Sequence, residues 1–358
     1  MDDSQPDPPL TAAALAACVA WFGAAPLEAG ASPGGGFSGS TPFRVRPRGT
    51  ATWFILKPFA PGTPHGRAAW VHRLAGHLAN AGVTEVPRPL ATPRGDTLVA
   101  DADGTLWEIV PFIDGVATDV PDVAQATAAL ECLARVHDAA ASLPDASPRA
   151  GQSDGVARRM ARARELLARP WRRRRPSSRP GTDAFAARLE RAVAIFDAAD
   201  GDRAVAAVAT ACVTDVPVQA VLRDVWSAHV LFAPGSPPRV AGVVDLHAAG
   251  IDTPATDLAR LLGSWRRGPA ADADPVRAWP EAVAAYDSRR PLSPAERALV
   301  PFLHAAGVVC GLDNWFRWTL DEGREFRDAD AAMTRIDTLL AALPAALGWL
   351  ADRGSIRV

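Results

Sequence analysis

The sequence predicts an α+β fold of two lobes, in which a small antiparallel sheet is followed by a larger helical lobe. The chain has 358 residues, more than the roughly 250–300 at which a single hydrophobic core stops growing. Short apolar runs typical of strands dominate up to about residue 114, and helical spacing dominates beyond it. We therefore expect an N-lobe over residues 1–114 and a C-lobe over residues 115–358.

The composition is that of an ordinary globular protein. A formal net charge of -2 with 48% hydrophobic residues does not favour a nucleic-acid partner. An alanine-rich apolar segment at residues 10–27 is broken by Gly23 and Pro26 and follows an acidic start, so it predicts a docked helix. We expect a cytoplasmic protein without a membrane partner. The four cysteines lack paired spacing, which argues against disulfides or a zinc site: Cys18, Cys132, Cys212 and Cys310.

The N-lobe is predicted from its strands and one further helix. Four short runs have the pattern of strands: residues 43–45, 52–57, 97–100 and 105–110. Apolar residues at helical spacing predict a helix over residues 65–80, which Gly82 ends. Pro111 to Gly115 then interrupts the last strand and marks the boundary between the lobes.

The C-lobe is predicted to be mostly helical. Helical periodicity covers residues 123–141, 183–199 and most of 276–350. His137 falls on the apolar face of the first of these, where we expect it to pack. The basic residues 158–179 are either an anion-binding patch or a solvated loop between helices, and we favour the loop because Trp171 is their only aromatic residue. The acids near Asp313 form either a solvated edge or the wall of a pocket for a polar, cationic ligand.

Lys57 is the only lysine in a chain that otherwise uses arginine for its basic residues. It lies in a largely apolar predicted strand, where a charge is unusual unless an anion meets it. The glycine-rich turn Gly34-Gly-Gly-Phe-Ser-Gly39 precedes it. Glycines let backbone N–H groups approach phosphate oxygens, and a nearby lysine reaches the same phosphates. The turn matches neither of the standard nucleotide-binding glycine motifs.

Three polar side chains surround one predicted hairpin in the C-lobe. Residues 230–232 and 240–244 predict two strands, and Ala-Pro-Gly-Ser-Pro-Pro between them has the composition of a turn. His229 precedes the first strand, Asp245 follows the second, and Asp224 lies on the loop leading in. An antiparallel pairing would return all three to the same end of the hairpin.

This combination of residues resembles the aminoglycoside phosphotransferase and choline kinase branch of the protein-kinase-like superfamily. Leu222-Arg-Asp224-Val-Trp-Ser-Ala-His229 has the spacing of the kinase catalytic loop, and Val243-Val-Asp245 stands where the superfamily carries a second metal-binding aspartate. Asp257-Leu-Ala259 matches the segment that follows in this branch. The resemblance implies a protein-kinase-like two-lobe fold and transfer of a phosphoryl group from a nucleotide to a small hydroxyl-bearing molecule.

The resemblance also implies a role for each matching residue. Asp224 would be the catalytic base, and Asp257 would brace the catalytic loop 222–229. His229 and Asp245 would bind Mg²⁺. ATP or GTP would be held by Lys57, by the glycine-rich turn and by a hinge facing the adenine: Gly36, Ser38, Gly39, Val110 and Phe112.

Three positions depart from the pattern of that branch. His229 replaces an asparagine, and because imidazole is a poor ligand for Mg²⁺, Mn²⁺ is an alternative metal. Leu222 replaces the histidine of the loop. The helix over residues 65–80 contains no glutamate to pair with Lys57, and neither Glu28 nor Glu85 is well placed to do so.

Two other functions compete with a small-molecule kinase. A catalytically weak or inactive nucleotide-binding regulatory protein would keep the fold but has little need of both Asp224 and Asp245. A metal hydrolase using these aspartates with His229 and His247 would leave Lys57 unexplained. The acceptor, the choice between ATP and GTP, and the oligomeric state stay open.

Overall fold

The computed structural model describes residues 10–31, 41–174, 183–212, 214–266, 274–326 and 328–353. Its elements form two compact units. The first combines Met1–Ala117 with His229–Ala249, and the second combines Thr118–Ala228 with Gly250–Val358. Strands dominate the first unit and helices the second, which confirms the predicted α+β class.

Residues 229–249 belong to the first unit by their contacts, although the sequence placed them in the C-lobe. The reason is strand pairing. β9 (Val230–Phe232) lies between β10 (Val240–Val243) and β6 (Val116–Ala117) in a three-stranded antiparallel sheet. The predicted hairpin therefore forms, and its first strand, β9, also pairs with β6.

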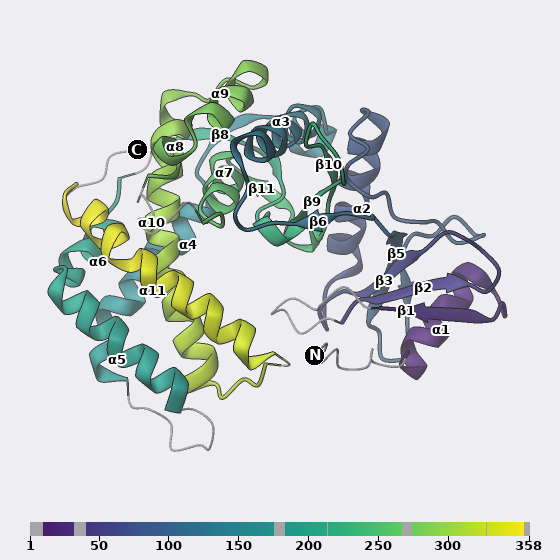
Figure 1. Cartoon of the computed structure of the whole chain (residues 1–358), viewed down its shortest axis with the longest axis horizontal. Helices are drawn as coiled ribbons and strands as arrows, with labels where there is room; N and C mark the ends of the chain where they lie inside the picture. The colour runs from purple at the N-terminus through teal and green to yellow at the C-terminus, as the bar shows by residue number, and fades with distance from the viewer. Residues whose placement is uncertain are drawn as a thin grey trace. The chain divides into compact units, whose positions relative to one another are not determined.

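The main sheet of the first unit has five antiparallel strands in the order β1-β2-β3-β5-β4. Their bounds are Leu27–Gly30 (β1), Phe43–Pro47 (β2), Phe54–Pro58 (β3), Leu106–Pro111 (β5) and Val99–Ala100 (β4). Helix α1 (Ala12–Phe22) packs its buried alanines and Trp21 on this sheet (Figure 1). Leu56 and Ile109 pair across β3 and β5, and both side chains are fully buried. This face of the sheet therefore belongs to the hydrophobic core of the unit.

Helix α2 spans His65–Asn80, the predicted range. Its apolar spacing buries one face, and Gly82 adopts φ 85° just beyond its end. Positive φ is readily available only to glycine, so the helix stops there.

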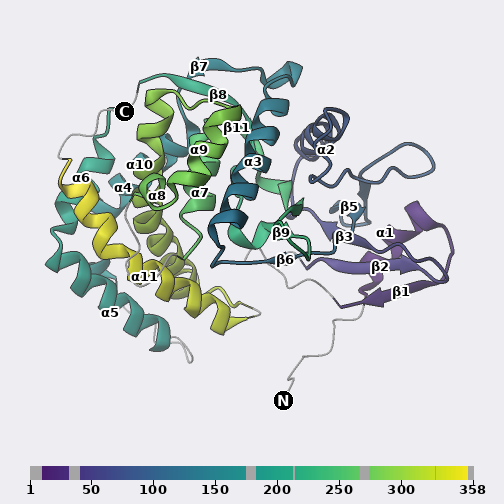
Figure 2. The ribbon, with the colours of Figure 1, turned by 45° about the horizontal axis from the view of Figure 1, so that its top comes forward.

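The second unit is built from helices around a small sheet. Its helices are α3 (Val123–Ala140), α4 (Asp154–Ala168), α5 (Asp183–Ala198), α6 (Gly201–Ala209), α7 (Ala255–Leu262), α8 (Pro275–Ala278), α9 (Pro280–Arg289), α10 (Pro294–Phe316) and α11 (Ala329–Ala351). Its strands are β7 (Arg149–Gly151), β8 (Val216–Val221) and β11 (Gly250–Asp252), in the order β11-β8-β7. Figure 2 shows these strands beside one another, and α11 lies alongside α10 (Figure 1).

The prediction of a solvated loop over residues 158–179 is wrong in its first half. Helix α4 continues to Ala168, and its start is capped by Ser153, which accepts a hydrogen bond from the Val156 amide at 3.2 Å. Its buried positions are Gly155, Val156, Ala163 and Leu166. The arginines between them concealed this apolar stripe in the sequence, because basic side chains extend to the surface from a packed helix. Residues 175–182 lie outside the described part of the chain.

Helix α10 with the π-helical turn after it, Pro294–Asp321, is long and apolar enough to cross a membrane by length and composition. Its most apolar window is 61% buried inside the structure, as in the core helix of a globular protein. A capping box formed by Ser293 and Glu296 begins it, and it packs against α7, α4 and α11. Its apolar surface is therefore used for packing within the second unit.

Candidate active site

Strand β3 places Lys57 opposite Asp245 in the first unit. The Lys57 Nζ lies 2.5 Å from the Asp245 Oδ1, and the lysine side chain is 14% exposed. Burial by itself would raise the pKa of Asp245, but the Lys57 ammonium outweighs it and holds that pKa below its usual value. Helix α2 offers no glutamate to pair with Lys57. In the structure its partner is Asp245, which follows β10.

Asp245 adopts a left-handed backbone conformation, with φ 65° and ψ 67°. This region is sparsely populated by residues other than glycine, and such conformations persist where surrounding contacts enforce them. Arg223, directly before Asp224, is a second case with φ 66°. Strained backbone thus occurs beside both aspartates that the sequence singles out.

The hairpin brings His229 to Asp245. Val230 pairs with Val243, and the Val244 amide donates to the His229 carbonyl at 2.9 Å. As a result the His229 Nε2 lies 3.9 Å from the Asp245 Oδ2. Three of the predicted residues, Lys57, His229 and Asp245, are therefore gathered within the first unit.

These side chains fit a divalent ion only with help from other ligands. No group of three or more His, Cys, Asp or Glu side chains suited to a metal occurs among the described residues. His229 and Asp245 could supply one nitrogen and one oxygen, while Lys57 engages the other carboxylate oxygen. A site of this kind suits an ion that arrives with phosphate oxygens and water, and its imidazole favours Mn²⁺ over Mg²⁺.

A buried network that sequence reasoning missed lies behind this pair. Glu108, 7% exposed, bonds His72 Nε2 and His247 Nε2, each at 2.7 Å. Burial would raise the pKa of Glu108, but the hydrogen bonds and charges of the two histidines outweigh it and lower that pKa. Phe59 stacks on the His247 ring with centroids 3.9 Å apart. The Nε2 of His247 is thus engaged by Glu108.

The network also ties α2 to the segment after Asp245. Arg67 of α2 donates to the carbonyls of His247 and Ala249, the first at 3.0 Å. The register that places Lys57 opposite Glu108 across β3 and β5 could have suggested that these two side chains belong to one region. No short motif in the sequence contains the two histidines and the glutamate, because they come from three separate segments.

In the second unit, Trp226 and Arg260 both contact Asp224. The Trp226 Nε1 donates to its Oδ1 at 2.7 Å, and the Arg260 Nη2 lies 3.3 Å from the same oxygen. The carboxylate is 40% exposed, so it remains accessible. These donors set the orientation of the carboxylate.

Asp257 is fully buried and holds the backbone that leads to Asp224. Its carboxylate accepts from the Leu222 amide at 2.7 Å and from the Arg223 amide at 2.6 Å. His137 Nε2 lies 3.0 Å from it, and the Nδ1 of the same ring lies 2.7 Å from the Tyr286 hydroxyl. Burial lowers the pKa of His137, so the imidazole is neutral at neutral pH.

The Asp313 carboxylate is buried and paired within the second unit. Asp313 is 2% exposed and accepts from Trp171 at 3.0 Å and from Arg174 at 2.6 Å, and Arg162 lies 3.3 Å away. Its carboxylate is used inside the helical core.

The predicted nucleotide contacts are described only in part. Gly36, Ser38 and Gly39 lie outside the described residues. Val110 pairs with Ile55 near the end of β5, and the Phe112 amide donates to the Trp53 carbonyl at 3.0 Å. Both side chains are half-buried, and Arg44 covers the Phe112 ring at 4.0 Å.

Comparisons with known proteins agree on one family. Residues 31–292 match the model of the phosphotransferase enzyme family. A homoserine kinase of Methylobacterium nodulans is 30% identical over 232 residues, which are 64% of this chain and 63% of that kinase. The chain therefore spans less than two thirds of the length of this relative.

Solved structures with low sequence identity share the fold. The amicoumacin kinase in complex with AMP-PNP, Ca²⁺ and amicoumacin has a TM-score of 0.59 at 11% identity, covering 91% of this chain and 92% of that one. A microcompartment-associated aminopropanol kinase has a TM-score of 0.57 at 15% identity, covering 95% and 98%. The predicted protein-kinase-like fold and the resemblance drawn from the sequence motifs are both confirmed. The chain belongs to the phosphotransferase enzyme family.

Proposed function

We propose that this protein transfers the γ-phosphoryl group of ATP or GTP to a hydroxyl of a small molecule. The observation that carries the proposal is the ion pair between Lys57 and Asp245 at 2.5 Å, in a chain whose family transfers phosphoryl groups. A lysine and a carboxylate on a strained turn are the parts that bind phosphate oxygens and a divalent ion. The homoserine, amicoumacin and aminopropanol kinases support a small acceptor.

Each side chain has a defined task in this proposal. The Lys57 ammonium would neutralise phosphate oxygens, and Asp245 with His229 would hold a divalent ion. When bound, that ion would offset the negative charge on the phosphates. Asp224 would accept the proton of the acceptor hydroxyl, with its carboxylate oriented by the Trp226 N–H and the Arg260 guanidinium.

The Lys57 to Asp245 pair leaves neither charge uncompensated, which lowers the cost of keeping both partly buried. The ammonium has further N–H donors from which phosphate oxygens would accept, and the Asp245 Oδ2 would remain for a divalent ion. In this proposal Lys57 and Asp245 serve the nucleotide, and Asp224 serves the acceptor.

The sole lysine allows a direct test. An amine-reactive reagent can modify only the Lys57 Nζ and the N-terminal amine, and mass spectrometry separates the two products. We expect ATP or GTP with Mg²⁺ or Mn²⁺ to slow modification of Lys57 and to leave the N-terminal amine unaffected. Equal modification with and without every nucleotide and metal combination would contradict the proposal.

Turnover separates this function from an inactive nucleotide-binding protein. The replacement of asparagine by His229 is the observation that keeps the inactive alternative in view. Nucleotide consumption that depends on a hydroxyl compound supports the kinase, and Asp224→Ala provides the blank. Protection of Lys57 without turnover for any amino alcohol, hydroxy acid or sugar supports the regulatory protein.

A further inference from the structure

The second unit contains a pocket beside Asp224 whose polar lining is basic. Arg159, Trp226, Arg260, His304 and Arg335 line it, together with apolar residues of α7, α10 and α11. The described residues that line it include no acid. Trp226 and Arg260 also contact the Asp224 carboxylate, so the pocket adjoins the proposed base.

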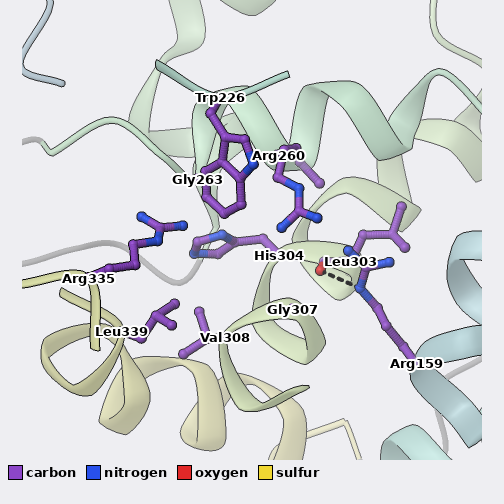
Figure 3. Close-up of a pocket in the computed structure, with 11 residues that line it drawn as sticks. Arg159, Trp226, Arg260, Gly263, Leu303, His304, Gly307, Val308, Arg335 and Leu339 are labelled. Carbon is purple, nitrogen blue, oxygen red and sulfur yellow. Dashed lines mark hydrogen bonds between the residues drawn. The ribbon is translucent and has the colours of Figure 1, made fainter. Parts of the chain in front are cut away.

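Four helices direct these side chains to one place. Arg159 comes from α4, Arg260 from α7, His304 from α10 and Arg335 from α11, and α10 packs against the other three. Figure 3 shows Trp226, Arg260, His304 and Arg335 pointing toward one another. The cavity volume is about 40 Å³, which is room for a small polar group the size of a few water molecules.

The arginines differ in what holds them. The Arg159 Nε donates to the Leu303 carbonyl at 3.1 Å and its Nη1 to the Gly155 carbonyl at 2.9 Å. Arg335 lies 3.9 Å from the centroid of the Trp226 ring and has no hydrogen-bond partner among the described residues. Its donors are therefore available, and the indole limits the conformations of its side chain.

Arg260 shares the same indole and is also incompletely satisfied. Its guanidinium lies 4.2 Å from the Trp226 ring centroid, and its buried Nε has no hydrogen-bond partner among the described residues. Two guanidinium groups thus stand on one ring, and Arg260 also forms an ion pair with the Asp224 carboxylate.

The positive charges disfavour one another. Burial, and then the charge of Arg260, lower the pKa of Arg159 and of Arg335 to about 10. Burial, followed by the charges of these two arginines, lowers the pKa of His304 to about 4, so its imidazole is neutral at neutral pH. Asp224 partly offsets the charges of Arg260 and Arg335, and Asp252 partly offsets that of Arg159. The described lining itself holds three cations and no acid, so a bound anion would relieve their mutual repulsion.

We propose that this pocket binds an anionic group of the acceptor, a carboxylate or a phosphate, through Arg335 and Arg260. The inference rests on the proposed function, since it takes Asp224 as the base that meets the acceptor hydroxyl. The acceptor is then a small hydroxyl compound with an oxyanion. Arginine forks bind the two oxygens of such a group with parallel hydrogen bonds, which a neutral amide or a cation cannot reproduce.

The test compares pairs of hydroxyl compounds in which one member carries an oxyanion and the other is neutral. The carboxylate pair is 4-hydroxybutyrate with its amide, and the phosphate pair is glycerol 3-phosphate with glycerol. Binding to the full chain is measured by calorimetry without nucleotide, and turnover is measured with it. We expect an anionic member to bind more tightly than its neutral partner, and the pair that shows the preference identifies the oxyanion.

Substitution of Arg335 assigns the preference to this pocket. We expect Arg335→Gln to weaken binding of the anionic member about 10- to 100-fold, the loss of a hydrogen-bonded charge, and to leave the neutral member unchanged. Arg335→Lys keeps the charge without the fork and should lose less. The matched control is Arg353→Gln, because Arg353 stands over Trp349 at the same 3.9 Å but does not line the pocket.

The two proposals fail in different ways. Equal binding of charged and neutral members, absence of binding by all anionic members, or a preference that survives Arg335→Gln would overturn the anion pocket. In each of these cases nucleotide protection of Lys57 would still be measurable in the same protein. If nucleotide does not protect Lys57 in the wild-type chain, the kinase function is contradicted. Calorimetry without nucleotide still tests the pocket in that case.

Discussion

Individual residues define this site through partners that are distant in sequence. Asp257 shows it best, because one buried carboxylate accepts two amides of the loop before Asp224 and contacts His137 of α3. Leu222, in the position where related loops carry a histidine, is 3% exposed and contributes its backbone amide. The side chain at that position can therefore be apolar, since an imidazole from another helix serves the carboxylate.

His304 is predicted to make stability depend on pH. Its folded-state pKa of about 4 lies below the ordinary 6.5, so the unfolded chain binds more protons between these values. Stability from neutral His304 is then fully present above about pH 6.5 and falls as the pH decreases toward 4. We expect His304→Gln, which cannot be protonated, to show a shallower fall when unfolding by urea is measured from pH 7.5 to 4.5.

The other titrating groups contribute equally to the wild type and to His304→Gln. His137, whose pKa burial also lowers, is the main one. The difference between the two pH dependences of stability therefore reports His304. Identical slopes for the two proteins would contradict the environment that the pocket provides for His304. Addition of an oxyanion that binds the pocket should raise the pKa of His304 and reduce the difference.

At the scale of elements, the end of α7 shapes the pocket. Gly263 follows this helix, and a Cβ at this position would overlap the His304 ring and lie 2.7 Å from the Ala259 carbonyl oxygen. The backbone oxygen cannot move aside as a flexible side chain does. We expect Gly263→Ala to destabilise the protein by about 1–3 kcal/mol, the usual cost of overpacking, in thermal or urea unfolding.

Gly348 in α11 is the matched control for this substitution. It lies inside a helix, with nothing within 4 Å of a Cβ placed on it. Alanine favours helices over glycine, so Gly348→Ala should be neutral or should stabilise by up to about 1 kcal/mol. Similar losses for both alanine variants would show that backbone preference, and not contact with His304, determines the result.

At the scale of the whole molecule, we propose that Lys57 and Asp245 serve the nucleotide and that Asp224 serves the acceptor. Asp245 lies in the first unit with Lys57, and Asp224 lies in the second with the arginine pocket. We expect Asp224→Ala to lower kcat by about 10²–10⁴-fold, as expected for loss of a general base, and to preserve stabilisation by nucleotide. Asp245→Ala should instead remove the metal-dependent part of that stabilisation, measured as the shift in Tm.

Reversed effects would contradict this division. Loss of nucleotide stabilisation in Asp224→Ala would mean that this carboxylate holds the metal or the phosphates. Retention of the full metal-dependent shift in Asp245→Ala would move the metal site elsewhere. Arg353→Gln, outside both sets of residues, checks that ordinary surface substitutions leave Tm and kcat unchanged.

Several helices and strands could be predicted from the periodicity of apolar residues. In those segments the local backbone preference agrees with the pattern of burial. Helix α2 has the predicted bounds, and the hairpin of β9 and β10 forms where two apolar runs flank a turn. Helix α4 escaped prediction because its arginines dilute the apolar stripe, and the grouping of residues 229–249 depends on pairing with β6, which is remote in sequence.

The sequence by itself determined the family, since Asp224, Asp245 and Asp257 stand in motifs whose spacing is local, and it singled out Lys57 as the only lysine. Tertiary structure alone decided their partners. The Lys57 to Asp245 pair joins residues 188 positions apart, and the arginine pocket draws its side chains from four helices. Long-range contacts of this kind depend on how elements pack, and residue spacing along one chain does not encode which charges burial will bring together.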